Sequence, residues 1–462
     1  MYEPSRIARK TQLILNGRSA RDRNARRLCL QALEAALVAI DPMKSVSAVL
    51  SLNRNRLRVG DFSTPIPKKI RVLAVGKASL PMLTGALRIL GKLVVSGILV
   101  APKTQKIIHP DKRVITFRAS HPIPDREGIR ASRQVIESIS RMRTDELLLC
   151  LISGGASAML PAPAADVTLD DKGRITRELI RSHASIHEIN TVRRHLSELK
   201  GGKLVERCGA GRIISLIISD VPGNIACDIA SGMTAPDPTT FQDAINVLRK
   251  LNLWESAPRR IRAHLRRGVA GGIAETPKPG DEIFEKVHNV IVADNHTACE
   301  AVRKTLNKQL TPTTVLTSSV DMDARGLGRL LASIAWDSEA VGGPIKLPGA
   351  LVLGGETTVD VKGTGKGGRN QEVVLAALTG IQGLKGVAIA ALGTDGIDGN
   401  SPAAGAVIDG QSMSHAIQLG LRLRRFMAEN DSYRFFRKLG DSIVTGQTGT
   451  NVGDVYLLVR AK

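Results

Sequence analysis

Aromatic side chains are scarce in this chain of 462 residues, since Phe, Trp and Tyr together make up only 3% of it. Proteins that bind single-stranded nucleic acid stack bases on such rings, so this class of function has little support. No apolar run approaches the roughly 20 residues that span a bilayer, and we therefore expect no membrane partner. The five cysteines show no C-x-x-C spacing, which argues against a zinc site or a disulfide framework and favours a reducing compartment.

Two common nucleotide-binding motifs are also missing. The Walker A pattern fails around Lys77, because Arg71 stands where the first glycine belongs and Ala78 follows the lysine. No G-x-G-x-x-G follows the first predicted strand, residues 70–75, which argues against a dinucleotide-dependent enzyme of the usual kind. A nucleotide phosphate would have to be held by other loops.

Positive charge is abundant: 65 Lys and Arg against 43 Asp and Glu give a formal net charge of +22. This charge suggests one alternative, a non-catalytic basic protein that binds nucleic acid. Because the arginines are spread along the chain, we instead expect anionic metabolites as ligands and no specific nucleic acid. The basic N-terminus lacks the apolar stretch of a secretory signal, so we expect a cytoplasmic protein, with organellar targeting as an alternative.

Short apolar runs followed by polar or glycine-rich loops recur along the chain. They cover residues 70–75, 94–100, 114–117, 147–152, 213–218, 290–292, 315–316, 351–353 and 387–392, and helical patterns cover 22–40, 80–90, 128–139, 175–199 and 241–267. This alternation predicts an α/β protein with mainly parallel sheets that are covered by helices on both faces. Ligands of such sheets bind beyond the carboxyl ends of the strands, where the polar clusters lie.

Proline and glycine punctuate the chain at residues 276–281 (TPKPGD), between two regions of this strand–loop–helix pattern. The length suits two or three domains of ordinary size. We therefore predict two domains, residues 1–281 and 282–462.

The stretch 353–372 combines more functional signals than any other. A strand pattern ends at Gly354, Gly355 and Glu356, and a second loop with four glycines carries Lys366 and Arg369 directly before a helical pattern. Glycines let backbone amides converge on an anion, and a helix start adds unpaired N–H groups and a positive dipole end. The stretch predicts a phosphate or carboxylate site; a glycine-rich turn with solvated cations is the alternative.

Other strand ends carry weaker signals. Lys77 could hold a phosphate, or it could be a solvated structural lysine. The small residues of SGGAS, 153–157, suit an anion or a substrate carboxylate as well as a tight turn. Asp220 could bind a metal or take a proton from a substrate hydroxyl, and a helix cap or turn is the alternative. Asp395 and Asp398 lie between glycines in a pattern that suits Mg²⁺, although Asx turns would have the same residues.

Ten ordered motifs together resemble the class II glycerate 2-kinase family, over nearly the whole chain. They include VGKAS (75–79), SHPIPD (120–125), SGGASAML (153–160), INTVRRHLSELKGGKL (189–204), SDVPGN (219–224), GGETTV (354–359), GKGGRNQE (365–372), GTDGIDG (393–399) and TGQTGTNVGD (445–454). The resemblance implies a Rossmann-like N-terminal glycerate kinase domain, a C-terminal MOFRL domain and an active site in the cleft between them. It also implies ATP-dependent phosphorylation of D-glycerate at its 2-hydroxyl, giving 2-phosphoglycerate and ADP, with Mg²⁺.

The resemblance points to the lysine of GKAS, the aspartate of SDVPG and the arginine of GGRNQ, which are Lys77, Asp220 and Arg369 here. We predict these three as catalytic residues and Asp220, Asp395 and Asp398 as metal ligands. We predict that ATP or glycerate binds to Ser79, Ser153, Gly154, Gly155, Ser157, Asn224, Gly354, Gly355, Glu356, Gly365, Lys366, Gly367, Gly368 and Asn370. We expect small-molecule substrates and a monomer or homodimer. An NAD(P)H-dependent hydroxypyruvate reductase is a second alternative.

Overall fold

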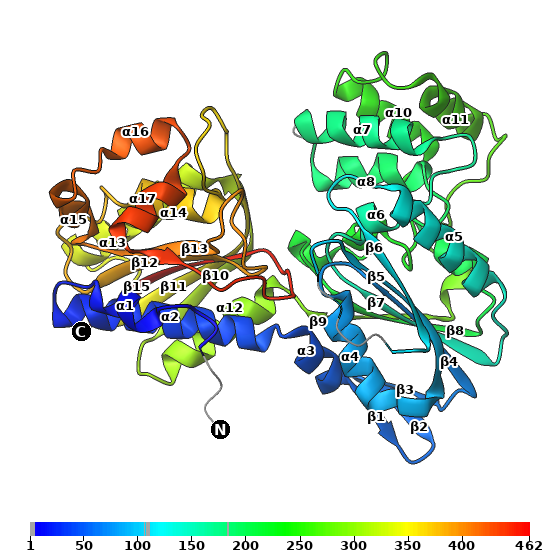
Figure 1. Ribbon diagram of the computed structural model, residues 1–462, viewed down its shortest axis with the longest axis horizontal. Coiled ribbons are helices and arrows are strands. Elements are labelled where there is room, and N and C mark those ends of the chain that lie inside the picture. Colours follow the sequence, from blue (N-terminus) through cyan, green and yellow to red (C-terminus); the bar gives the residue numbers. More distant parts are fainter. Residues whose placement is uncertain (1–4, 106, 108–110, 183) are drawn as a thin grey trace. The chain divides into compact units, whose positions relative to one another are not determined.

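The computed structural model describes residues 5–105, 107, 111–182 and 184–462. The chain forms two compact units (Figure 1). The central unit is Pro42–Val292, and the terminal unit combines Met1–Asp41 with Ala293–Lys462. Among the described residues, none of the helices combines the length and the apolarity that crossing a membrane requires.

The central unit is built on a six-stranded sheet with the strand order β6-β5-β4-β7-β8-β9. Its strands are β4 (Lys69–Val75), β5 (Val94–Pro102), β6 (Val114–Ala119), β7 (Glu146–Ile152), β8 (Arg212–Ile218) and β9 (Val287–Ala293). The strands from β6 to β8 pair in parallel, and β7 is buried along its whole length. The predicted parallel sheet is therefore confirmed in this unit. A small antiparallel sheet of β1 (Leu50–Asn53), β2 (Arg56–Val59) and β3 (Phe62–Pro65) accompanies it.

Two apolar cores stabilise the central unit. One lies against the main sheet, where β4, β5, β7 and β8 pack with α5 (Arg126–Ser140), α6 (Ala156–Met159) and α9 (Lys203–Arg207). The other lies among helices alone, around Phe241 and Trp254, and joins α7 (Leu169–Arg181), α8 (Ile186–His195), α10 (Phe241–Lys250) and α11 (Arg259–Val269). Figure 1 shows these four helices as a group beside the sheet. The remaining helices are α3 (Pro42–Val49) and α4 (Ser79–Leu90), which pack on each other.

One predicted helix is two helices. Residues 175–199 were expected to be continuous, but α7 ends at Arg181 and α8 begins at Ile186. Ser185 starts α8 with a capping box, in which its side chain accepts the amide of Glu188 and the Glu188 carboxylate accepts the amide of Ser185. The signal for this break is Ser-x-x-Glu within an otherwise helical pattern.

The terminal unit also contains a six-stranded sheet, in the order β10-β11-β15-β12-β13-β14. Its strands are β10 (Thr313–Asp323), β11 (Gly349–Thr358), β12 (Val387–Gly393), β13 (Gly405–Asp409), β14 (Ser442–Ile443) and β15 (Asp454–Arg460). Only β10 and β11 pair in parallel; the other four pairs are antiparallel. The expectation of a mainly parallel sheet is therefore wrong here. Strands buried on both faces are apolar throughout in either case, so apolar runs alone do not give strand direction.

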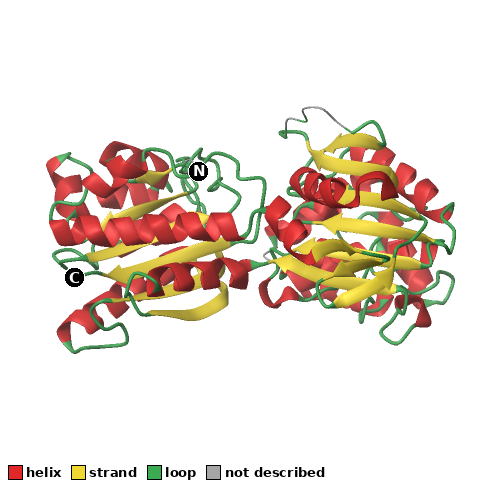
Figure 2. Cartoon of the chain, turned by 90° about the horizontal axis from the view of Figure 1, so that it is seen from below, coloured by secondary structure: helices red, strands yellow, loops and turns green. Residues whose placement is uncertain are grey.

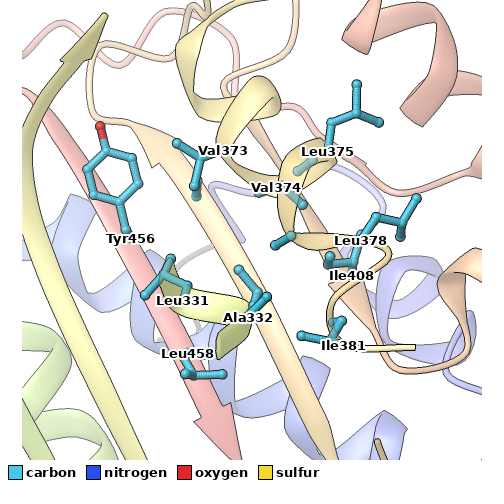
Figure 3. Packing of buried hydrophobic residues seen from close by; sticks show 14 of the residues in the cluster. Leu331, Ala332, Val373, Val374, Leu375, Leu378, Ile381, Ile408, Tyr456 and Leu458 are labelled. Atoms are coloured by element: carbon cyan, nitrogen blue, oxygen red, sulfur yellow. The ribbon is translucent and has the colours of Figure 1, made fainter. Parts of the chain in front are cut away.

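Helices cover both faces of this sheet. On one face α2 (Ala20–Ala39) and α12 (Asn295–Asn307) pack against each other and against the strands, and Figure 2 views this face with the helices in red before the yellow strands. On the other face α13 (Ala324–Ala340), α14 (Arg369–Ala377) and α17 (Ser432–Leu439) enclose the apolar core that Figure 3 shows, with Val374 and Leu378 against Ile408. The short helices α1 (Lys10–Leu15), α15 (Ser412–Gln418) and α16 (Leu423–Ala428) complete the unit.

The division of the chain differs from the predicted one. We expected residues 1–281 in one domain, but the first 41 residues pack with the C-terminal part. Arg26 of α2 explains much of this, because its buried guanidinium pairs with Asp409 and with Asp441, the latter at 2.7 Å, and donates to the backbone oxygen of Leu13 at 3.0 Å. These ion pairs link the N-terminal helices to residues 383 and 415 positions further along, which local sequence pattern does not reveal.

Candidate active site

Three loops of the central unit meet at one edge of its sheet. They follow β4, β7 and β8, which are adjacent and parallel, so their carboxyl ends point the same way. The first loop carries Lys77, the second is residues 153–157, and the third carries Asp220. The three loops therefore lie at the same end of the sheet, and Lys77 and Asp220 are both partly exposed.

The first two loops are locked together by hydrogen bonds. The Lys77 amide donates to the oxygen of Gly154 at 2.9 Å, and the Ala78 amide donates to the Ser153 hydroxyl at 3.0 Å. Gly76 has a φ of +117°, and a Cβ there would lie 2.4 Å from the Ser153 oxygen atoms. The loop after β4 thus needs glycine for its close approach to the loop after β7. Together the two loops form a platform that includes the backbone of Lys77.

Two of the predicted ligand residues serve the platform itself. The buried Ser79 hydroxyl donates to the oxygen of Val100 at 3.2 Å, and the buried Ser153 hydroxyl donates to Val75 at 3.4 Å. Both side chains thereby hold loops to strands. Their contact with a ligand stays a prediction, as does that of Gly154 and Gly155.

Ser157 connects the platform to helix α8. Its hydroxyl lies 2.7 Å from that of Ser231, which donates to Asn190 Oδ1 at 2.8 Å. Asn190 in turn donates to the oxygen of Asp228 at 2.9 Å. This chain of polar contacts fixes α8 next to the loop 153–157. Asn190 belongs to the motif INTVRRHLSELKGGKL, and the sequence predicted no role for this residue.

The third loop turns sharply after β8. The Ser219 hydroxyl accepts the Val221 amide at 3.3 Å, and Gly223 and Asn224 follow with φ of +74° and +55°. This turn presents Asp220 and Asn224 at the strand end, as the sequence predicted.

In the terminal unit, Arg369 at the start of α14 is held between two carboxylates. Its Nε donates to Asp454 at 2.5 Å and its Nη2 to the same carboxylate at 3.2 Å, while its Nη1 pairs with Glu356. Asp454 is buried and also accepts the Tyr456 hydroxyl at 3.0 Å. Burial opposes the charged form, but the two carboxylates outweigh it and raise the pKa of Arg369. Arg369 is thus a permanently charged, oriented guanidinium.

Sequence reasoning missed Asp454 as the residue that positions Arg369. It closes the motif TGQTGTNVGD, and its place at the first position of β15 brings it next to α14. Because β15 itself was not predicted, no sequence signal linked the two residues.

The glycine-rich loop before α14 is bonded differently from the prediction. We expected its amides to face an anion, but those of Lys366 and Gly367 donate to Asp431 at 2.8 Å and Asn400 at 2.9 Å. The Gly365 amide donates to the oxygen of Glu429. The glycines are needed for packing, since a Cβ on Gly367 or Gly368 would lie 2.0 Å from Ser432 and 2.3 Å from Asp398, respectively. Ligand contact by this loop stays a prediction and would involve the exposed Lys366 side chain.

Gly354 and Gly355 likewise allow close packing. A Cβ on Gly354 would lie 1.6 Å from Asn295 Oδ1, and Gly355, with φ of +143°, lies against the backbone of Val320. Glu356, which follows them, is the exposed partner of Arg369.

Asp398, a predicted metal ligand, caps α14. Its two oxygens accept the backbone amides of Asn370 and Gln371 at 3.0 and 2.9 Å and both of their side-chain amides. Burial raises the pKa of Asp398 to about 6 despite these bonds. Asp395 lies at the preceding turn and accepts the Ile397 amide at 3.1 Å. Within the described parts of the chain, no three or more His, Cys, Asp or Glu side chains gather in a way that could hold a metal.

Comparisons with known proteins agree with the motifs. Residues 28–266 match a domain of unknown function, DUF4147, and residues 349–454 match the MOFRL family. The chain is 36% identical to the glycerate 2-kinase of Pyrococcus horikoshii, covering 94% of this chain and 97% of that protein. It is 33% identical to an Agrobacterium vitis protein provisionally named a hydroxypyruvate reductase, over 95% of each.

A solved structure extends this agreement to three dimensions. The crystal structure of glycerate kinase from Thermotoga maritima superposes with a TM-score of 0.81 at 32% identity, covering 94% of this chain and 99% of that one. Sequence matches in both parts of the chain and a shared architecture confirm the resemblance: the protein belongs to the class II glycerate kinase family.

Proposed function

We propose that this protein is a glycerate 2-kinase, which transfers the terminal phosphoryl group of ATP to the 2-hydroxyl of D-glycerate and releases 2-phosphoglycerate and ADP. Family membership supports this function, since the relatives from Pyrococcus horikoshii and Thermotoga maritima are named glycerate kinases. The observation that carries it is that three loops share one edge of the sheet. Lys77 supplies a cation there, the loop 153–157 a platform that suits an anion, and Asp220 an acid.

The chemistry follows from the residues. Phosphoryl transfer depends on positioning and on neutralising charge more than on covalent help. Lys77 would offset the charge that develops on the transferred group. Arg369, whose direction the carboxylates beside it fix in advance, is a second proposed catalytic cation, in the terminal unit. Asp220 would orient the 2-hydroxyl and accept its proton as the oxygen attacks phosphorus. The electron pair of the broken bond then stays on ADP.

Mg²⁺ fits this chain as an ion held mainly by the nucleotide. Magnesium keeps waters and usually takes one or two carboxylates together with substrate phosphates, so a larger carboxylate cluster is not required. Asp220 in the central unit and Asp395 in the terminal unit stay separate candidates for its ligand, whereas the Asp398 oxygens are already engaged by α14. When bound, the ion would offset negative charge on the phosphates.

The test is a coupled assay with D-glycerate, ATP and Mg²⁺, with the phosphorylated position identified by NMR. We expect 2-phosphoglycerate. Formation of 3-phosphoglycerate would contradict the position of transfer, and no ADP formation with glycerate would contradict the function.

A hydroxypyruvate reductase is the second candidate, because a relative carries that provisional name. It would oxidise NAD(P)H with hydroxypyruvate, and a falling absorbance at 340 nm would reveal it. The loop after β4, VGKAS, lacks the dinucleotide fingerprint, so we expect no change.

A further inference from the structure

The central unit buries two lysines that have no carboxylate as a hydrogen-bond partner. Lys172 Nζ donates to the backbone oxygens of Pro161 at 2.6 Å and Leu196 at 3.0 Å, and Lys200 Nζ donates to Leu160 at 2.7 Å. Both side chains are almost fully buried. Buried cations are ordinarily paired with acids, so this pattern calls for an explanation.

Arg193 of α8 adds a third cation to this cluster. It is partly exposed, and within the described residues it makes no hydrogen bond or ion pair. Lys172 bonds to Leu196, three residues after Arg193 at the end of the same helix, which places the two side chains in one neighbourhood. Arg194, the residue after Arg193, differs because it pairs with Asp228 and, at 3.0 Å, with Asp237.

Burial lowers the pKa of all three groups. The pKa of Lys200 falls to about 7 and that of Lys172 falls as well, in both cases through burial first and through the nearby charge of Arg193 second or later. Burial lowers the pKa of Arg193 only to about 10. Arg193 therefore keeps its charge at neutral pH.

The cluster lies beside the platform of the candidate site. Asn190 is three residues before Arg193, so the two side chains share a face of α8. Asn190 reaches Ser157 through Ser231. The acceptors of the lysines, Leu160 and Pro161, directly follow α6, which begins in the same loop. Arg193 thus belongs to the helix that these contacts tie to the loop 153–157.

We propose that Arg193 binds the carboxylate of the hydroxy-acid substrate beside the loop 153–157, which makes it a substrate-specificity residue of the proposed kinase. A guanidinium offers two parallel N–H groups that match a carboxylate. The lysines, held by backbone oxygens, leave Arg193 as the available donor. A single positive charge suits a monoanion better than the several charges of a triphosphate, although the oxyanion chemistry is shared.

The test compares Arg193→Met with the wild-type protein in the glycerate kinase assay. We expect the KM for D-glycerate to rise by about 100-fold, the size of a lost bidentate, charge-assisted contact, while the KM for ATP stays within about twofold. D-glyceramide, whose amide replaces the carboxylate, should be a poor substrate for both proteins, so the preference of kcat/KM for glycerate should collapse in the variant. A folding defect alone would not change this preference.

Stability supplies a second readout. Because Arg193 is partly exposed and has no acid partner among the described residues, Arg193→Met should keep a melting temperature close to that of the wild type. D-glycerate alone should raise the melting temperature of the wild type and leave that of the variant unchanged. Arg177→Ala, an exposed arginine on the neighbouring α7, is the charge-matched control and should behave as wild type. Arg193→Lys should recover part of the glycerate affinity, because lysine restores the charge without the two parallel N–H groups of a guanidinium.

The outcomes separate this inference from the proposed function. If the wild type phosphorylates glycerate but Arg193→Met keeps its KM for glycerate, or loses affinity for ATP instead, the inference is wrong while the function stands. If the wild type has no kinase activity, the proposed function fails, and the melting shift with D-glycerate still decides whether Arg193 binds the acid.

Discussion

Three cations of the central unit lack the acid partners that Arg369 and Arg26 of the terminal unit have, although Arg194 of the central unit has two. In the terminal unit Arg369 is flanked by Asp454 and Glu356, and Arg26 by Asp409 and Asp441. In the central unit Lys172 and Lys200 bond only to backbone oxygens and Arg193 to no described residue.

The difference separates two ways of preparing a site for an anion. A carboxylate partner fixes a cation in one direction and keeps it charged, at the cost of neutralising part of its field. A buried cation without an acid keeps its full field, but it lowers the free energy of unfolding until a ligand arrives. We infer that acid partners orient Arg369 within the terminal unit, whereas Arg193 of the central unit carries a charge with no acid partner among the described residues.

The largest expected effect is on catalysis. Lys77→Ala and Arg369→Ala should each lower kcat by about 10³-fold or more, as the loss of a cation that stabilises the transition state does in other phosphoryl transfer enzymes. The coupled kinase assay measures kcat. Arg369→Lys is a further variant, which keeps the charge and loses the paired N–H groups of the guanidinium.

Lys362→Ala is the matched control for these variants, because this exposed lysine lies in the same glycine-rich loop as Lys366 and pairs only with exposed Asp360. It should keep wild-type activity. If Arg369→Ala also does, its carboxylate partners have reduced it to a structural residue, and the comparison between the units loses its functional meaning.

The next largest effect is on folding. Arg26→Met leaves Asp409 and Asp441 buried without their cation and should lower the free energy of unfolding by about 3–5 kcal/mol. Urea denaturation measures this. Arg21→Met removes an exposed arginine from the same helix and should change stability by less than about 0.5 kcal/mol. Equal effects of the two variants would show that the buried ion pairs do not hold the N-terminal helices in place.

Much of the fold could be predicted from sequence because buried strands form recognisable apolar runs. β4, β7 and β8 are short apolar runs that each end in a polar loop, and the predicted positions of Lys77 and Asp220 follow from that alone. Strand direction in the terminal unit could not be predicted, because β15 enters between β11 and β12 from the far end of the chain.

The site was predicted less completely, for a related reason. The glycines before α14 suggest an anion-binding loop because their hydrogen-bond partners are distant in sequence. Asp431, which accepts the Lys366 amide, lies 65 residues away. Arg193 and Arg194 are adjacent and chemically identical in sequence. Only folding pairs one with Asp228 and leaves the other without a described partner.

A pH experiment tests the charge of the central unit. Burial lowers the pKa of Lys200 to about 7, below its ordinary value of 10.5. Between these values the unfolded chain binds the proton and the folded chain does not, so this lysine makes stability fall as the pH falls. Lys200→Met lacks the proton in both states. Its stability relative to wild type should therefore increase by about 2–3 kcal/mol when the pH is lowered from 9.5 to 7.5.

Denaturation at the two pH values gives this difference, and the lost hydrogen bond to Leu160 adds only a pH-independent offset. Lys250→Met, at an exposed lysine, should show a difference that does not change with pH. If Lys200→Met behaves the same way, Lys200 is charged in the folded protein and the cluster holds more positive charge than we infer.

The smallest effect distinguishes the two partners of Arg369. Glu356 is about half exposed whereas Asp454 is buried, so water already weakens the first pair but not the second. Glu356→Gln keeps an acceptor for Arg369 and should change the free energy of unfolding by less than about 1 kcal/mol. Its kcat should fall by no more than about tenfold, because Asp454 still fixes the guanidinium. Asp454→Asn should lower kcat further, since the variant loses the charge that the buried pair depends on. Equal losses of kcat in the two variants would mean that burial of the partner does not decide how firmly Arg369 is oriented.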